Sequence, residues 1–257
     1  MKEVDKICND LNKMWSELST IEKENVELCV NPPYVYLDRV RTCLTEEIAV
    51  GSQNVFDALG PNGGNTGTIT AKMIRAVGSE WVLLGHSDRR NNLGETNGLI
   101  AEKVEETLAS GLGVILTIGE LPAQRRWGRT LSVLKKQLGM AMKGIKSNEW
   151  HKAVIAYEPV WAVGDGTTPC SPEEAQRINE ELRKYITEKV GLDAAEACRL
   201  TYTGSVNEKN AADYAPLVDV DGFVIGRAGL DTAKLKSIIQ TMARDGRSSP
   251  MNAQDEL

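Results

Sequence analysis

The sequence predicts an α/β fold, a (β/α)8 barrel of which seven of the eight strands are visible. Short apolar runs recur along the chain and are separated by helical patterns, as expected for parallel strands covered on both faces. The length of 257 residues also matches one such barrel, about 250 residues. We therefore expect one domain over residues 1–244, followed by a polar, disordered tail over residues 245–257.

The chain begins with a helical pattern. Apolar side chains in the first 24 residues recur every three or four positions, which predicts an amphipathic helix. Seven apolar runs then predict strands over residues 26–30, 48–51, 81–84, 113–118, 153–157, 199–202 and 222–226. Because eight strands close this kind of barrel, we expect the remaining strand to precede Met1.

Composition limits the partners and the compartment. The net charge of −6 argues against nucleic acid or an anionic membrane as a partner. Five cysteines without C-x-x-C spacing favour reduced thiols, and no signal peptide or apolar span is visible, so we expect a cytoplasmic protein. The end, Gln254-Asp255-Glu256-Leu257, partly resembles a retention signal, but a frayed polar terminus is the preferred interpretation.

Residues 156–168, AYEPVWAVGDGTT, place a carboxylate at a strand end. The run 153–157 leads directly into Glu158 and Pro159. A charge at the end of a buried strand costs free energy unless it is used, and barrel enzymes build their active sites there. Ser171 and Pro172 then open a helix as N-cap and first residue. The pattern predicts a strand, a functional glutamate, a mobile loop and a helix.

This segment resembles the catalytic-glutamate and lid segment of the triosephosphate isomerase family. Further motifs of that family stand in the same order at predicted strand ends. They are Asn31-Pro32-Pro33-Tyr34, Gly51-Ser52-Gln53-Asn54, Gly85-His86-Ser87-Asp88-Arg89-Arg90, Thr117-Ile118-Gly119-Glu120, Tyr202-Thr203-Gly204-Ser205 and Asp219-Val220-Asp221-Gly222-Phe223-Val224-Ile225-Gly226. The resemblance covers residues 26–230. It implies a TIM barrel that interconverts dihydroxyacetone phosphate and glyceraldehyde 3-phosphate through an enediolate.

The resemblance also implies the catalytic roles. Glu158 is implied as the base that moves a proton between adjacent carbons, and His86 as the neutral electrophile that polarises the carbonyl. The family is itself the standard example of a glutamate base with a histidine kept neutral by a helix N-terminus. Asp88 stands where the family usually has glutamate. The alternative for His86 is a hydrogen-bonded core histidine without a catalytic role.

Substrate phosphate and subunit contacts are implied in the same way. The phosphate donors are backbone groups at Gly164 in the lid, at Ser205, and at Gly226 with its neighbour Arg227. No metal or cofactor is implied, and the expected partner is a small phosphorylated triose. The loop Asn62-Gly63-Gly64-Asn65-Thr66-Gly67 resembles the dimer-forming loop of the family, which implies a homodimer.

Four departures from the family pattern bear on activity. The family's first strand ends in an Asn-x-Lys segment that contacts the substrate, and this sequence has no such segment before residue 26. Thr203 and Arg227 stand in place of glycines, so we expect a Cβ where the backbone needs glycine's freedom. Asp165 and Thr167 make the lid more acidic than usual. Arg227 either supplies a cation to the phosphate or crowds it.

Three interpretations follow. The chain is a functional isomerase with a further N-terminal segment, a shorter paralogue that binds or scaffolds without turnover, or a subunit completed by a partner's strand. We expect residues 1–257 alone to be poorly active and less stable than a closed barrel. A short N-terminal extension that forms a strand and ends in Asn-x-Lys should then raise both activity and stability.

Overall fold

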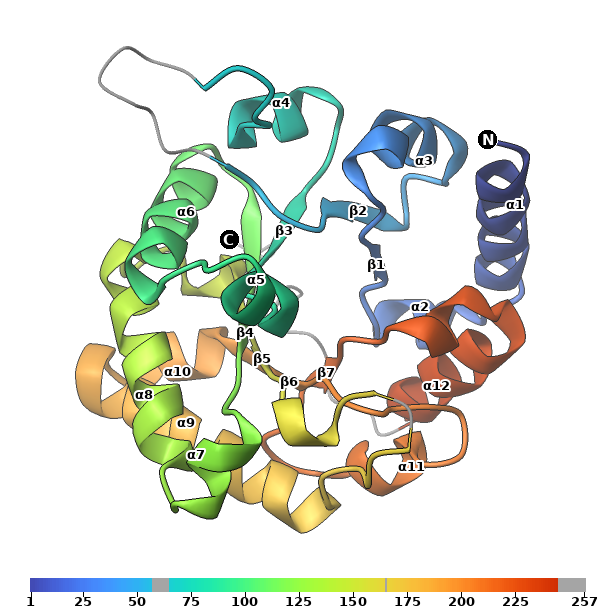
Figure 1. Ribbon diagram of the computed structural model, residues 1–257. Helices are drawn as coiled ribbons and strands as arrows, with labels where there is room; N and C mark the ends of the chain where they lie inside the picture. Colours follow the sequence, from blue (N-terminus) through green and yellow to red (C-terminus); the bar gives the residue numbers. More distant parts are fainter. Residues whose placement is uncertain (57–64, 165, 245–257) are drawn as a thin grey trace.

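The computed structural model describes residues 1–56, 65–164 and 166–244 (Figure 1). Seven strands form one sheet in the order β1-β2-β3-β4-β5-β6-β7, and every neighbouring pair is parallel. The sheet is curled and has helices around it. The predicted α/β class and the seven predicted strands are confirmed. The tail expected to be disordered, residues 245–257, lies outside the described residues.

The strand bounds agree with the prediction best in the middle of the sheet. The strands are β1 (Cys29–Val30), β2 (Ala49–Ser52), β3 (Trp81–Leu84), β4 (Gly113–Ile118), β5 (Ala153–Tyr157), β6 (Arg199–Tyr202) and β7 (Gly222–Phe223). Strands β3 to β6 begin and end as predicted. The predicted lengths of β1 and β7 were wrong, because each has one neighbour among the described residues and pairs over only two positions. That an added strand would close the sheet stays a prediction.

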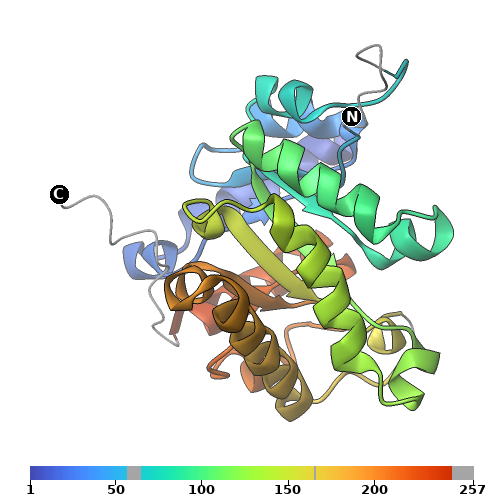
Figure 2. The same cartoon turned by 90° about the vertical axis from the view of Figure 1, so that its left-hand side faces the viewer.

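Helices cover the outer face of the sheet. The longer ones are α1 (Lys2–Ser16), α6 (Asn97–Ala109), α8 (Thr130–Ala141), α9 (Pro172–Val190) and α12 (Thr232–Arg244). The shorter ones are α2 (Thr20–Glu24), α3 (Leu37–Cys43), α4 (Ala71–Ala76), α5 (Ser87–Asn92), α7 (Pro122–Arg126), α10 (Leu192–Ala197) and α11 (Ala211–Tyr214). Five 3-10 turns complete the described part: η1 (Tyr34–Tyr36), η2 (Met142–Gly144), η3 (Trp150–Lys152), η4 (Val160–Ala162) and η5 (Arg227–Leu230). Figure 2 shows α6, α8 and α9 side by side.

Local sequence signals account for several helix starts. Ser19 and Glu22 form a reciprocal capping box at α2, and Thr70 and Thr96 cap α4 and α6 through their side chains. The predicted start of α9 is confirmed, because Ser171 Oγ accepts the Glu174 N–H at 3.3 Å. Each cap satisfies a backbone donor that the helix itself leaves free.

The sheet buries side chains on both faces. Most core residues lie between the sheet and the helices. A smaller cluster on the alternate strand positions lies inside the curl and contains Ala49, Trp81, Ile115, Val154 and Ala156. Polar residues, among them His86 and Glu158, follow the carboxyl ends of the strands.

The last helix packs against the first two, so the ring of helices closes beside β1 and β7 (Figure 1). Lys236 Nζ in α12 lies 2.7 Å from the Glu17 carboxylate. Asn25, just after α2, donates to the Ala243 carbonyl at 3.1 Å. Helix contacts therefore join the two ends of the sheet without a strand pairing between them in the described residues.

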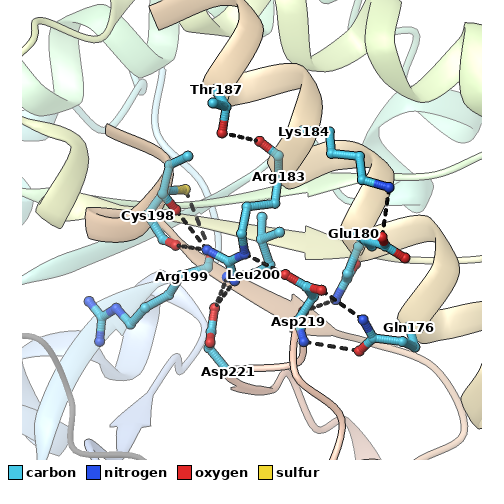
Figure 3. Close-up of polar contacts among 12 residues, drawn as sticks. Gln176, Glu180, Arg183, Lys184, Thr187, Cys198, Arg199, Leu200, Asp219 and Asp221 are labelled. Carbon is cyan, nitrogen blue, oxygen red and sulfur yellow. Dashed lines mark hydrogen bonds and ion pairs between the residues drawn. The ribbon is translucent and has the colours of Figure 1, made fainter. Parts of the chain in front are cut away.

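One half-buried arginine connects α9 to β6 and to the segment before β7 (Figure 3). The Arg183 guanidinium lies 2.6 Å from Asp219 and 2.7 Å from Asp221, and it donates to the carbonyls of Ala195 and Cys198. Gln176 holds Asp219 from the same helix through bonds of 2.7 and 2.9 Å. This cluster fixes the last two strands against the longest helix.

Candidate active site

Glu158 follows β5 directly and is only 2% exposed. Its backbone N–H donates to the Ile118 carbonyl at 2.8 Å, which extends the β4–β5 ladder by one residue. Its carboxylate accepts the Ser87 N–H at 2.9 Å and the Ser87 hydroxyl at 2.9 Å. Burial raises the pKa of Glu158, against the opposing effects of His86 and the Ser87 bonds. A carboxylate with a raised pKa is a stronger base than one in water.

His86 lies between β3 and α5 and caps the helix. Its Nδ1 accepts the Asp88 backbone N–H at 3.2 Å, which fixes the orientation of the ring. Its Nε2 lies on the other side of the ring, 3.2 Å from Glu158 Oε1. The structure therefore brings the two main predicted residues together.

Asp88 lies beside this pair, on the exposed side of α5. Its side chain is 74% exposed, and its carboxylate is 3.6 Å from His86 Nδ1. It also accepts a bond from Asn92 at 3.4 Å. The negative charge of Asp88 also contributes to the raised pKa of Glu158, as a smaller effect than burial.

The segment predicted to form the lid starts directly after Glu158. Gly164 has a φ of +112°, and a Cβ added there would contact no other atom within 4 Å. This position therefore favours glycine because of its backbone conformation and not because a side chain would clash. Thr167, one of the unusual lid residues, donates to the Gly164 carbonyl at 2.9 Å. Ser205 Oγ donates to Ala162 in η4 at 3.0 Å and ties the next loop to the lid. Asp165 lies outside the described residues.

The expected backbone conflict at two glycine replacements is not observed. No described residue other than glycine has a positive φ, so the expectation for Thr203 and Arg227 was wrong. The Thr203 N–H donates to the Tyr157 carbonyl at 2.9 Å, which continues the β5–β6 pairing by one residue. Arg227 is exposed and follows Gly226 at the start of η5.

The sequence motifs did not identify how the lid is anchored. Glu120 is fully buried and accepts bonds from Trp161 Nε1 at 2.8 Å and from Tyr157 and Thr130 at 3.2 Å. The Arg125 guanidinium stacks 3.7 Å from the centre of the Trp161 ring. Glu120 has the same signal as Glu158, a carboxylate just after a buried strand. The role of Ser87 was missed because a serine beside a histidine carries no such signal.

A comparison with models of protein families shows which family the chain belongs to. The model of the family described as triosephosphate isomerase matches residues 1–242. The chain belongs to the triosephosphate isomerase family. The family itself is the standard example of a glutamate base combined with a histidine at a helix N-terminus.

Several named relatives are similar over most of their length. The triosephosphate isomerase of Emericella nidulans is 42% identical over 210 residues, 82% of this chain and 83% of the relative. The cytosolic enzyme of Oryza sativa subsp. japonica is 40% identical over 228 residues, 89% of this chain and 87% of its own. The chloroplastic enzyme of Secale cereale is 39% identical over 231 residues, which are 89% of this chain and 73% of the relative.

The raised pKa of Glu158 predicts a pH dependence. Below that pKa the carboxyl is protonated and cannot accept a proton, so kcat/KM should rise with pH through an apparent pKa above the ordinary value of 4.5. The measurement is kcat/KM against pH, corrected for the second ionisation of the substrate phosphate near about pH 6. A rising limb at or below the ordinary glutamate value would contradict the effect of burial.

Proposed function

We propose that Glu158 and His86 carry out the interconversion of dihydroxyacetone phosphate and glyceraldehyde 3-phosphate in this chain. The reaction follows from membership of the triosephosphate isomerase family. The observation that supports the residue roles is the 3.2 Å contact between His86 Nε2 and the buried Glu158 carboxylate. Nothing in the comparisons favours the alternative, a paralogue that binds without turnover.

In the proposed mechanism, one base serves two adjacent carbons. Glu158 removes a proton from the carbon beside the carbonyl, and the electron pair moves onto the carbonyl oxygen to give the enediolate. The His86 Nε2–H donates to the developing oxyanion, and the hydroxyl proton passes between the two oxygens through Nε2. Glu158 then returns its proton to the neighbouring carbon. Before this, substrate has to replace Ser87 as the partner of one carboxylate oxygen.

The phosphate is proposed to lie against backbone N–H groups at Gly164, Ser205 and Gly226. Such groups bind a dianion without side-chain charge. The Ser205 bond to Ala162 supports this arrangement, because movement of the lid then alters the loop that carries a phosphate donor. A closed lid excludes water from the enediolate.

Replacing His86 by glutamine should lower kcat by about 100-fold or more, because the developing oxyanion loses its preorganised partner. The measurement is the isomerase rate at saturating substrate. His151→Gln is a matched control, because His151 is the second of the two histidines in the sequence and is exposed at the opposite end of β5. Equal kcat for His86→Gln and the control would contradict the electrophile role.

We propose that Arg227 takes part in phosphate binding from the start of η5. Its planar guanidinium suits phosphate oxygens bidentately. Arg227→Gly should then weaken inhibition by inorganic phosphate about tenfold, the effect of one lost charged hydrogen bond. Dihydroxyacetone, which lacks the phosphate, is the control ligand. Tighter phosphate inhibition in Arg227→Gly would show that Arg227 obstructs the site.

We propose a cytosolic homodimer. The loop Asn62-Gly63-Gly64-Asn65-Thr66-Gly67 is the suggested contact; its first three residues lie outside the described part, and Asn65 to Gly67 are exposed. Five free cysteines and the cytosolic rice relative support the compartment, while the rye relative is chloroplastic. Within the described residues, none of the helices has the length and apolar character needed to cross a membrane.

A further inference from the structure

The backbone beyond the end of β4 lies directly against the backbone of Glu158. A Cβ on Gly119 would lie 1.9 Å from the Glu158 carbonyl oxygen and 3.4 Å from Val160. No side chain fits there, so the Gly119 peptide forms the wall next to Glu158 and the start of the lid. The position of that wall determines where the Glu158 backbone lies.

An amide from α8 holds this wall. Gln137 Oε1 accepts the Gly119 N–H at 2.9 Å, and Gln137 Nε2 donates to the Gly119 carbonyl at 2.9 Å. Both backbone groups of one residue are therefore bound by one side chain. Leu134 and Leu138, on either side of Gln137 in α8, are fully buried, so the amide projects from an anchored helix.

Packing alone does not fix Gly119. A cavity of ≈ 250 Å³ lies beside it, lined by Gly119, Gln137, Glu158, Ser87 and Val160 among others. The Gly119 peptide has room to move on that side if the amide clamp is lost. A misplacement of about 1 Å in a catalytic group costs up to about 100-fold in rate.

We propose that Gln137 is a positioning residue that sets the place of Glu158 through the Gly119 peptide. It makes no contact with the reacting atoms. This inference rests on the proposed role of Glu158 as the base. It predicts that loss of the clamp affects turnover more than substrate binding, because the phosphate donors lie on other loops.

The test compares two helix amides that each clamp one partner residue. Gln137→Met keeps the side-chain length and removes both bonds, and Gln137→Glu keeps an acceptor for the Gly119 N–H. Gln176→Met is the matched control, since Gln176 in α9 makes a similar pair of bonds to Asp219. For each variant, the midpoint temperature of unfolding is measured first. The values of kcat and KM and the pH profile of kcat/KM are then measured well below that temperature.

We expect Gln137→Met to lower kcat about 10- to 100-fold with KM within about twofold, and to shift the apparent pKa of the rising limb. Gln137→Glu should lose less, and Gln176→Met should lower the unfolding midpoint without changing kcat. Unchanged kcat in Gln137→Met, or an equal loss in Gln176→Met, would overturn the inference. Glu158→Gln is measured alongside to separate the two claims. If Glu158→Gln retains turnover, the base assignment itself is wrong. If Glu158→Gln loses turnover while Gln137→Met keeps the wild-type kcat, only the positioning role is wrong.

Discussion

Glu158→Gln is expected to lower the isomerase rate by about 10²- to 10⁴-fold, the contribution typical of a positioned general base. Glutamine keeps the shape of the side chain and an acceptor for the Ser87 N–H, which lies 2.9 Å from the carboxylate. The lower rate would therefore be due to the loss of a basic carboxylate and not to the loss of the hydrogen bond with Ser87. A variant that retains half the activity would remove Glu158 from the mechanism.

The same substitution has a predicted effect on stability. Burial raises the pKa of Glu158 in the folded state. Its contribution to stability is therefore present below the unfolded pKa and is lost as pH rises through the higher folded pKa. At neutral pH the carboxylate costs stability, so Glu158→Gln should unfold at the same temperature as the wild type or slightly above it. A clearly lower unfolding midpoint would mean that structural damage contributes to the lost activity.

The largest expected effect on stability comes from Arg183. Arg183→Ala should lower the free energy of unfolding by up to about 3–5 kcal/mol, because it removes the cation that pairs with the buried Asp219 carboxylate and with Asp221. The side chains of Asp219 and Asp221 are 10% and 26% exposed, and the Arg183 guanidinium forms an ion pair with each of them (Figure 3). Denaturant unfolding of the two proteins measures the difference.

Arg177→Ala is the matched control for that comparison. Arg177 lies on the same helix and pairs with Glu174 at 2.8 Å, but its side chain is 50% exposed. An exposed pair contributes about 1 kcal/mol or less. If the two variants lose the same stability, the Arg183 cluster does not hold α9 to the last two strands as described.

Continuous apolar runs were enough to place β3 to β6, because each of these strands is buried between two neighbours. They overestimated β1 and β7, since the ends of a strand depend on its partners and not on its own composition. Side-chain partners were harder to predict. Arg183 meets Asp219 and Asp221 across 36 and 38 residues of sequence, and no local periodicity encodes such a pairing.

In the candidate site, too, the positions of residues at strand ends were easier to predict than the contacts between side chains. The family resemblance supplied the roles of Glu158 and His86. Their positions were predictable because each polar residue follows a buried strand, and strand ends meet at one edge of a parallel sheet. Ser87 and Gln137 were not, because they act through backbone groups and hydrogen bonds that only the folded chain brings together. The expected strain at Thr203 was wrong because this residue does not have a positive φ.

Exchange of carbon-bound hydrogen with solvent tests the central claim most directly. Dihydroxyacetone phosphate is incubated in D2O with the wild type, with His151→Gln and with Glu158→Gln, and deuterium at the carbon beside the carbonyl is followed by NMR. If Glu158 is the base, the wild type and His151→Gln incorporate deuterium and Glu158→Gln does so at least about 100-fold more slowly. Exchange at the wild-type rate in Glu158→Gln would show that another group removes the proton.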